Sequence, residues 1–168
     1  GRWTYASPVD KGDAAAKAGA LYVPYGGLFA PNILLAEALH KAPGRSLDLA
    51  PSGRATLNPL TTLEVEHGGN RKTLTAYTID GISLSPVPIW FEGEKVFGSA
   101  SFLNFMPEGW EAVAPQLSKA QDEALAKRAP ALMAKLAPRQ TGPVVFSNVR
   151  IYDADGLAFR EGMTVVAE

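Results

Sequence analysis

Hydrophobic and polar residues alternate along the middle of the chain. A period of two is typical of strands that bury one face. The segments that carry it are residues 46–50, 55–67, 71–80, 87–93 and 95–102. Short turns join them, among them His67-Gly68-Gly69-Asn70 and Glu92-Gly93-Glu94. The pattern predicts one curved antiparallel sheet built as a meander.

The alternation also assigns side chains to faces of that sheet. In the segment 87–93, Ile89 and Phe91 are two residues apart and should share a face. Trp90 lies between them in the sequence and should point to the opposite face.

A helix is predicted over residues 31–42. Pro31 suits a first helical turn, where its missing N–H is not needed. Pro43 and Gly44 then end the helix. The apolar stripe expected to face the core consists of Ile33, Leu34, Ala38 and Leu39.

A second helical stretch covers residues 106–137. Apolar residues recur there every three or four positions, namely Met106, Trp110, Val113, Leu117, Ala120, Ala124, Leu132 and Leu136. Pro115 and Pro130 each remove a backbone hydrogen bond, so we expect two or three helical pieces with kinks. Unbroken, this stretch would span about 45 Å, which is enough to cross a sheet.

The N-terminal region gives weaker signals. Residues 2–6 have strand composition, and residues 7–19 are small, polar and expected to be mobile. Residues 21–32 are expected to form an irregular, aromatic-rich link. Gly26 and Gly27 within this link have two interpretations, a turn or a cradle for a phosphate. The sequence shows no strand–loop–helix context around them, so it favours the turn.

A boundary is predicted near residues 138–142, within the polar, proline-bracketed stretch 137–143. It separates an N-terminal α+β domain, residues 1–138, from a β segment, residues 139–168. In the second part, residues 144–153 and 162–168 should form two strands joined across residues 154–161. An isolated hairpin is only marginally stable in water, so we expect these strands to pack against other parts of the chain or against a part of the protein beyond it. Both ends of the sequence suggest a segment of a longer protein.

Together, the predicted strands and helices give the fold class α+β: a curved antiparallel meander sheet with a long kinked helix packed on it, followed by a short β segment.

Composition excludes several functional classes. The chain has 168 residues, 16 basic and 17 acidic, and its net charge is −1. The basic residues are scattered singly, so nucleic-acid binding is not expected. There is no cysteine, which rules out disulfides and thiolate chemistry. No apolar run is long enough to predict a transmembrane segment, and the opening residues, "GRWTYASPVD", have no signal-peptide pattern.

No catalytic, cofactor-binding or metal-binding residue is predicted. His40 and His67 are the two histidines, nothing places them together, and both are expected to be structural. Asp153-Ala154-Asp155-Gly156 resembles the start of a calcium loop but lacks the later ligands, so a turn is favoured. Glu64 and Glu66 share a strand face, which has two interpretations, an acid–base pair or a solvated face, and the solvated face is preferred.

The last part of the chain resembles the entry segment of metal-dependent amidohydrolases of the imidazolonepropionase-like type. The stretch is "PVVFSNVRIYDADGLAFREGMTVVAE", residues 143–168. In that family an apolar strand carries an Asn, an apolar-x-apolar-x-Asp pattern follows, and a Gly-x-Thr-Val-x-Val strand comes after a turn. The matching positions here are Asn148, Val149, Ile151, Asp153, Gly162, Thr164, Val165 and Val166.

The preceding residues resemble an N-terminal extension found on some bacterial amidohydrolases. The matching stretches are "LYVPYGG", "ILLAEALHKAPGRSLDLAPSGRATL", "LTAYTIDGISLSPVPIWFE" and "EGWEAVAPQLSKAQ". The resemblance implies an accessory domain followed by the first strands of a small β-sandwich, with the catalytic barrel absent from this sequence. That barrel would be the chain's main partner. It would hold the zinc-like divalent metal that activates water to hydrolyse C–N bonds, so no cofactor is expected in this chain.

An alternative remains open at this point. A curved sheet under a helix can hold a lipid or another apolar ligand, and the chain would then be a stand-alone binding module. The space between the sheet and the helix can equally be a closed core filled by side chains. A homo-oligomer is also possible. The family resemblance favours an extracytoplasmic setting, periplasmic or secreted, but the sequence itself leaves the compartment unknown.

Overall fold

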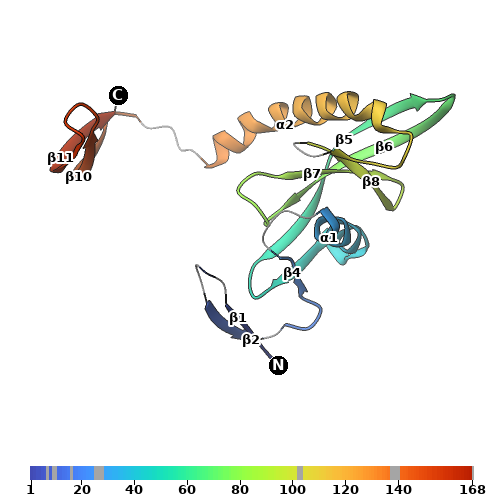
Figure 1. The fold of residues 1–168 in the computed structure, drawn as a ribbon, viewed down its shortest axis with the longest axis horizontal. Helices are drawn as coiled ribbons and strands as arrows, with labels where there is room; N and C mark the ends of the chain where they lie inside the picture. Colours follow the sequence, from blue (N-terminus) through green and yellow to red (C-terminus); the bar gives the residue numbers. More distant parts are fainter. Residues whose placement is uncertain are drawn as a thin grey trace. The chain divides into compact units, whose positions relative to one another are not determined.

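The computed structural model describes residues 1–6, 8, 11–15, 17–24, 29–101, 104–136 and 141–167 (Figure 1). The chain divides into two compact units, Gly1–Lys127 and Arg128–Glu168. The predicted boundary between residues 138 and 139 lies outside the described residues and stays a prediction.

A seven-stranded sheet forms the centre of the first unit (Figure 1). Its strands lie side by side in sequence order: β3 (Leu21–Tyr22), β4 (Ser46–Ala50), β5 (Arg54–His67), β6 (Asn70–Asp80), β7 (Val87–Glu92), β8 (Lys95–Ala100) and β9 (Asn104–Phe105). Neighbouring strands are antiparallel from β4 to β9. The predicted α+β class and antiparallel meander are confirmed. The short strand β3, which runs parallel to β4, lies within the predicted irregular link.

The β5–β6 hairpin contains a bulge that changes which side chains face which side. The register shifts between Pro59 and Thr61, so Leu60 is the extra residue. Before the bulge, Leu57 packs in the hydrophobic cluster around the first helix. After it, Leu63 and Val65 contribute to a second cluster on the opposite face. One strand therefore supplies both faces of the sheet with apolar side chains.

The first helix, α1, spans Phe29–Lys41 and is followed by a 3-10 turn, Pro43–Arg45. The predicted stripe is wrong in part. The buried residues are Leu35, Ala36 and Leu39, whereas Leu34 is 68% exposed. Apolar residues surround this helix on most sides, so periodicity alone could not select the face that packs on the sheet.

The second helix, α2, spans Ala114–Leu136 and is preceded by a 3-10 turn, η2 (Glu111–Val113). The expected separate pieces are not found. Pro115 lies in the first turn, where it interrupts no hydrogen bond, and Pro130 lies inside the continuous helix. Met106 and Trp110 precede the helix but still pack against the sheet.

The apolar stripe predicted for the second helix is confirmed only in its first half. Leu117 is fully buried and Ala120 packs beside it. Leu132 and Leu136 are 42% and 68% exposed, so the stripe is not buried in the second half of the helix. Among the described residues, no helix is both long and apolar enough to cross a membrane.

The two helices lie against opposite faces of the sheet (Figure 1). The cluster on the α1 face, which we call the α1 core, includes Ile89 and Phe91. The cluster on the α2 face, the α2 core, includes Trp90. The predicted alternation of these three residues is confirmed. All three are at most 2% exposed, so both faces are tightly covered at this strand.

An N-terminal hairpin joins β1 (Arg2–Ala6) to β2 (Lys11–Ala15). The strand at residues 2–6 was predicted. Residues 11–15, within the small, polar stretch that was expected to be mobile, form a strand because they pair with the aromatic first strand. Trp3 stacks on Tyr22 of β3, with 6.5 Å between ring centroids.

The second unit contains a hairpin of β10 (Val144–Asp153) and β11 (Ala158–Ala167). The turn is shorter than predicted, because β11 begins at Ala158 and pairs along residues expected to form a loop. Two bulges interrupt the pairing. Asn148 and Gly162, which have φ angles of 54° and 65°, lie at these bulges. None of the described residues in this hairpin is buried.

Candidate functional site

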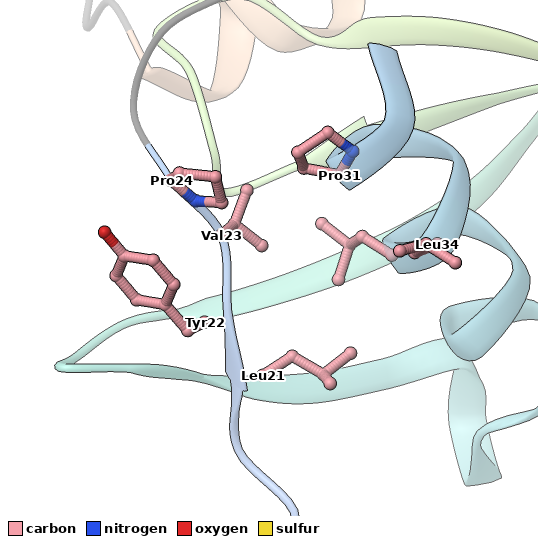
Figure 2. Close-up of a pocket in the computed structure, with 7 residues that line it drawn as sticks. Leu21, Tyr22, Val23, Pro24, Pro31 and Leu34 are labelled. Atoms are coloured by element: carbon pink, nitrogen blue, oxygen red, sulfur yellow. The ribbon is translucent and has the colours of Figure 1, made fainter. Parts of the chain in front are cut away.

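A small, partly open apolar pocket lies between β3 and α1 (Figure 2). Its volume is about 240 Å³. Leu21, Tyr22, Val23 and Pro24 line one side, and Pro31, Leu34 and Leu35 line the other. The pocket therefore forms where a strand leads into a helix.

Local topology explains this position. β3 and β4 are parallel, and α1 connects them as a crossover. The pocket lies between the carboxyl end of β3 and the first turns of α1. Ligands often bind beyond the carboxyl ends of strands in open parallel α/β sheets, but here the two-residue strand β3 gives the one parallel pairing among the described strands of this sheet.

The lining limits what the pocket can do. The side chains are aliphatic or proline, apart from Tyr22, whose hydroxyl is turned away from α1 (Figure 2). No acid, base or cation is among them. The pocket can therefore hold an apolar group but offers no acid–base chemistry.

His40 lies in an aromatic environment in the last turn of α1. Its ring stacks on Phe91 with 5.0 Å between centroids and meets Tyr77 edge-on at 5.6 Å. The guanidinium of Arg45 lies over the ring of Tyr77, 5.0 Å from its centre. These contacts fix the end of α1 on the sheet, in agreement with the structural role predicted for His40.

His67 lies on the other face of the sheet. Its ring is 6.1 Å from that of Trp110, which belongs to the α2 core. His40 contacts the α1 core instead. As the sequence suggested, the fold does not bring the two histidines together.

Glu64 and Glu66 lie on an exposed strand face, as the preferred interpretation predicted. Glu66 accepts a hydrogen bond of 2.7 Å from Arg71 across the hairpin. Glu64 stands opposite Thr73. With one carboxylate in an ion pair and both in solvent, the arrangement is that of a solvated face.

Asp153 caps the turn of the β10–β11 hairpin. Its Oδ1 accepts hydrogen bonds of 3.2 Å from the backbone N–H groups of Asp155 and Gly156, and its Oδ2 contacts Arg160. The N–H of Gly156, followed by the guanidinium of Arg160, lowers the pKa of this carboxyl below its ordinary value of 3.8. The turn interpretation is confirmed.

Gly26 and Gly27 lie outside the described part, although a strand precedes them and a helix follows. No group of three His, Asp or Glu side chains in the described ranges could hold a metal ion.

One polar cluster was missed in the sequence analysis. The indole Nε1 of Trp90 donates a 3.1 Å hydrogen bond to Oε1 of Gln121, and Nε2 of Gln121 donates to the carbonyl oxygen of Ala100. Gln121 is 2% exposed. The sequence contains a sign of this cluster. Gln121 follows Leu117 by four residues, so this polar side chain lies on the apolar stripe of the helix, where it needs a buried hydrogen-bond partner.

Comparisons with known proteins give no relative. No family model matches the chain, and no match is found among the curated proteins or the solved structures.

Proposed function

We propose that this chain is the non-catalytic N-terminal portion of a bacterial amidohydrolase-family hydrolase. In this proposal β10 and β11 supply the first strands of a composite β-sandwich. The rest of the parent protein would carry the barrel that hydrolyses C–N bonds with a metal-activated water.

The observation that supports the proposal is the uncovered apolar face of the hairpin. Phe146 pairs with Val165 and Val149 with Met163, so these four side chains share one face. Phe146 is 51% exposed and Val165 39% exposed. Two strands alone are marginally stable in water, and a sandwich would cover such a face with a second sheet.

The opposite face also carries apolar side chains, since Val145 pairs with Val166 there. On the same face, Arg150 lies 3.9 Å from Glu161 and places its guanidinium 4.6 Å from the ring centre of Phe159. Tyr152 packs edge-on against that ring. Val145 and Val166 are 56% and 54% exposed, so apolar side chains are uncovered on both faces of the hairpin.

The metal implied by the resemblance does not fit residues of this chain. His40 and His67 contact different cores, and no suitable group of donors is found in the described residues. We therefore assign the metal to the parent's barrel and derive no catalytic step from this chain.

Two measurements test the proposal. The reading frame beyond the codon for Glu168 should encode the barrel, with a His-x-His motif soon after this point. A stop codon directly after Glu168 would contradict the proposal. Independently, the purified chain should show no amidase or dipeptidase turnover, and stoichiometric zinc accompanied by turnover would also contradict it.

A second candidate function is the binding of an apolar ligand, which the pocket between β3 and α1 favours. Both sheet faces are tightly covered at β7, so the pocket is a better candidate than the space under α2. Leu34→Asp would place a carboxylate in the pocket, and Leu84→Asp is its control because Leu84 is fully exposed elsewhere. Binding of N-phenyl-1-naphthylamine should be lost only in Leu34→Asp. Equal binding by both variants would reject this candidate.

A further inference from the structure

The second edge of β5 is unpaired over much of its length. β4 pairs with β5 only at residues 54–56, where Ser46 lies opposite Thr56. In the part of the chain that the structure describes, no strand pairs with the edge of β5 that faces away from β6 at residues 60–67. We call this segment the outer edge of β5. The end of the β5–β6 hairpin extends past the start of α2 (Figure 1).

An unpaired edge presents backbone N–H and C=O groups that can accept another strand. Residues 60–67 are long enough for this, because strands commonly have about five or six residues. We propose that the outer edge of β5 binds an extended peptide in which basic and apolar residues alternate. The peptide would add one strand to the sheet.

Charge favours a basic partner. Glu64 and Glu66 are both exposed on one side of the outer edge. The nearby cations on β6 already have partners, since Arg71 pairs with Glu66 and Lys72 pairs with Glu92. Lysine or arginine side chains from an added strand would stand beside Glu64, where cross-strand pairs of opposite charge stabilise a sheet.

The other side of the outer edge is apolar. Leu60 and Leu63 are only half-buried, although both pack against the α2 core. Because side chains alternate along a strand, a bound peptide would place its second set of residues beside these leucines. In a peptide of alternating basic and β-branched residues, the basic side chains would lie beside Glu64 and the β-branched side chains beside Leu60 and Leu63.

The same carboxylates disfavour pairing with a second copy of the chain. Antiparallel pairing of two outer edges would bring the Glu64 and Glu66 side chains of both copies into one sheet. Like charges on adjacent strands are destabilising. This choice of occupant does not depend on the proposed function.

The test uses a fluorescently labelled peptide of about seven alternating Lys and Val residues, titrated with the full chain and followed by anisotropy. We expect saturable binding, and Glu64→Lys should weaken it about three- to tenfold. Glu123→Lys, an exposed change on α2, is the matched control and should bind as the unaltered chain does. A circular-dichroism melt of each variant checks that the fold is intact.

Two further peptides make the test decisive. A peptide with Glu in place of Lys should not bind. An N-methylated Lys–Val peptide keeps its charge but loses backbone donors, so it should bind much more weakly. Equal binding of the methylated peptide, no binding of the original, or a dimer of the chain that Glu64→Lys abolishes in sedimentation would each overturn the proposal.

Discussion

The indole nitrogen of Trp90 lies 3.1 Å from Oε1 of Gln121, and this hydrogen bond joins the centre of the sheet to α2. Trp90 is 0% exposed and Gln121 2% exposed. The amide nitrogen of Gln121 reaches the carbonyl oxygen of Ala100. One buried side chain therefore satisfies two polar groups that water does not reach.

Replacing Gln121 by Leu should destabilise the first unit by about 2–4 kcal/mol, because the Trp90 N–H and the Ala100 carbonyl each lose a partner while buried. Urea unfolding followed by tryptophan fluorescence measures this. Glu123→Ala, an exposed change on the same helix, should alter the free energy of unfolding by less than about 0.5 kcal/mol. A loss under about 1 kcal/mol for Gln121→Leu would mean that the hydrogen bonds contribute little.

Leu34 and Leu35 are adjacent in α1 but should respond very differently to truncation. Leu35 is 1% exposed and Leu34 is 68% exposed. Leu35→Ala should cost about 2–5 kcal/mol because it leaves a cavity in the α1 core. Leu34→Ala should cost less than about 1 kcal/mol. Thermal and urea denaturation of the two variants measures both losses. A larger loss for Leu34→Ala than for Leu35→Ala would mean that α1 packs on the sheet through the stripe predicted from the sequence, which contains Leu34.

Gly98 in β8 should not tolerate a side chain. A Cβ at this position would meet the carbonyl oxygen of Phe105 and the Cβ of Met106. We expect Gly98→Ala to destabilise the first unit by about 1–3 kcal/mol through overpacking. Gly142→Ala, where a Cβ would meet nothing, serves as the control in the same calorimetric measurement. Equal melting temperatures for the two variants would refute the close approach.

The turn of the β10–β11 hairpin should weaken at acid pH. The folded pKa of Asp153 lies below 3.8, since hydrogen bonds from Gly156 and Arg160 favour the carboxylate. The stabilisation is therefore present above the ordinary pKa and is lost as the pH falls through the lower, folded value. NMR titration of the Asp153 side-chain carbon should give a midpoint below 3.8, together with a lower protection factor against amide exchange at Gly156 in acid. Asp153→Asn should remove this pH dependence, and a midpoint at or above 3.8 would contradict the turn geometry.

Alternation of residues predicted the sheet well because its cause is local. Ile89, Trp90 and Phe91 point where the period of two places them. Helix faces were harder to predict, because apolar residues surround α1 and only the packing of a complete fold selects Leu35 over Leu34.

Long-range pairing was the main source of error. β2 is built from Lys, Gly, Asp and Ala, which have little strand propensity, and it forms only by pairing with β1. β3 has two residues and exists because β4 lies beside it. The pocket follows from that pairing, so the pattern of residues did not predict it.

The bulge at Leu60 has a consequence for how the chain can change in length. Pro59 and Thr61 pair with the adjacent residues Tyr77 and Ala76, so removing Leu60 would leave a regular ladder in which Leu63 and Val65 keep their side of the sheet. The hairpin can therefore lose one residue at this point without turning the Glu64 and Glu66 carboxylates into the layer beneath α2.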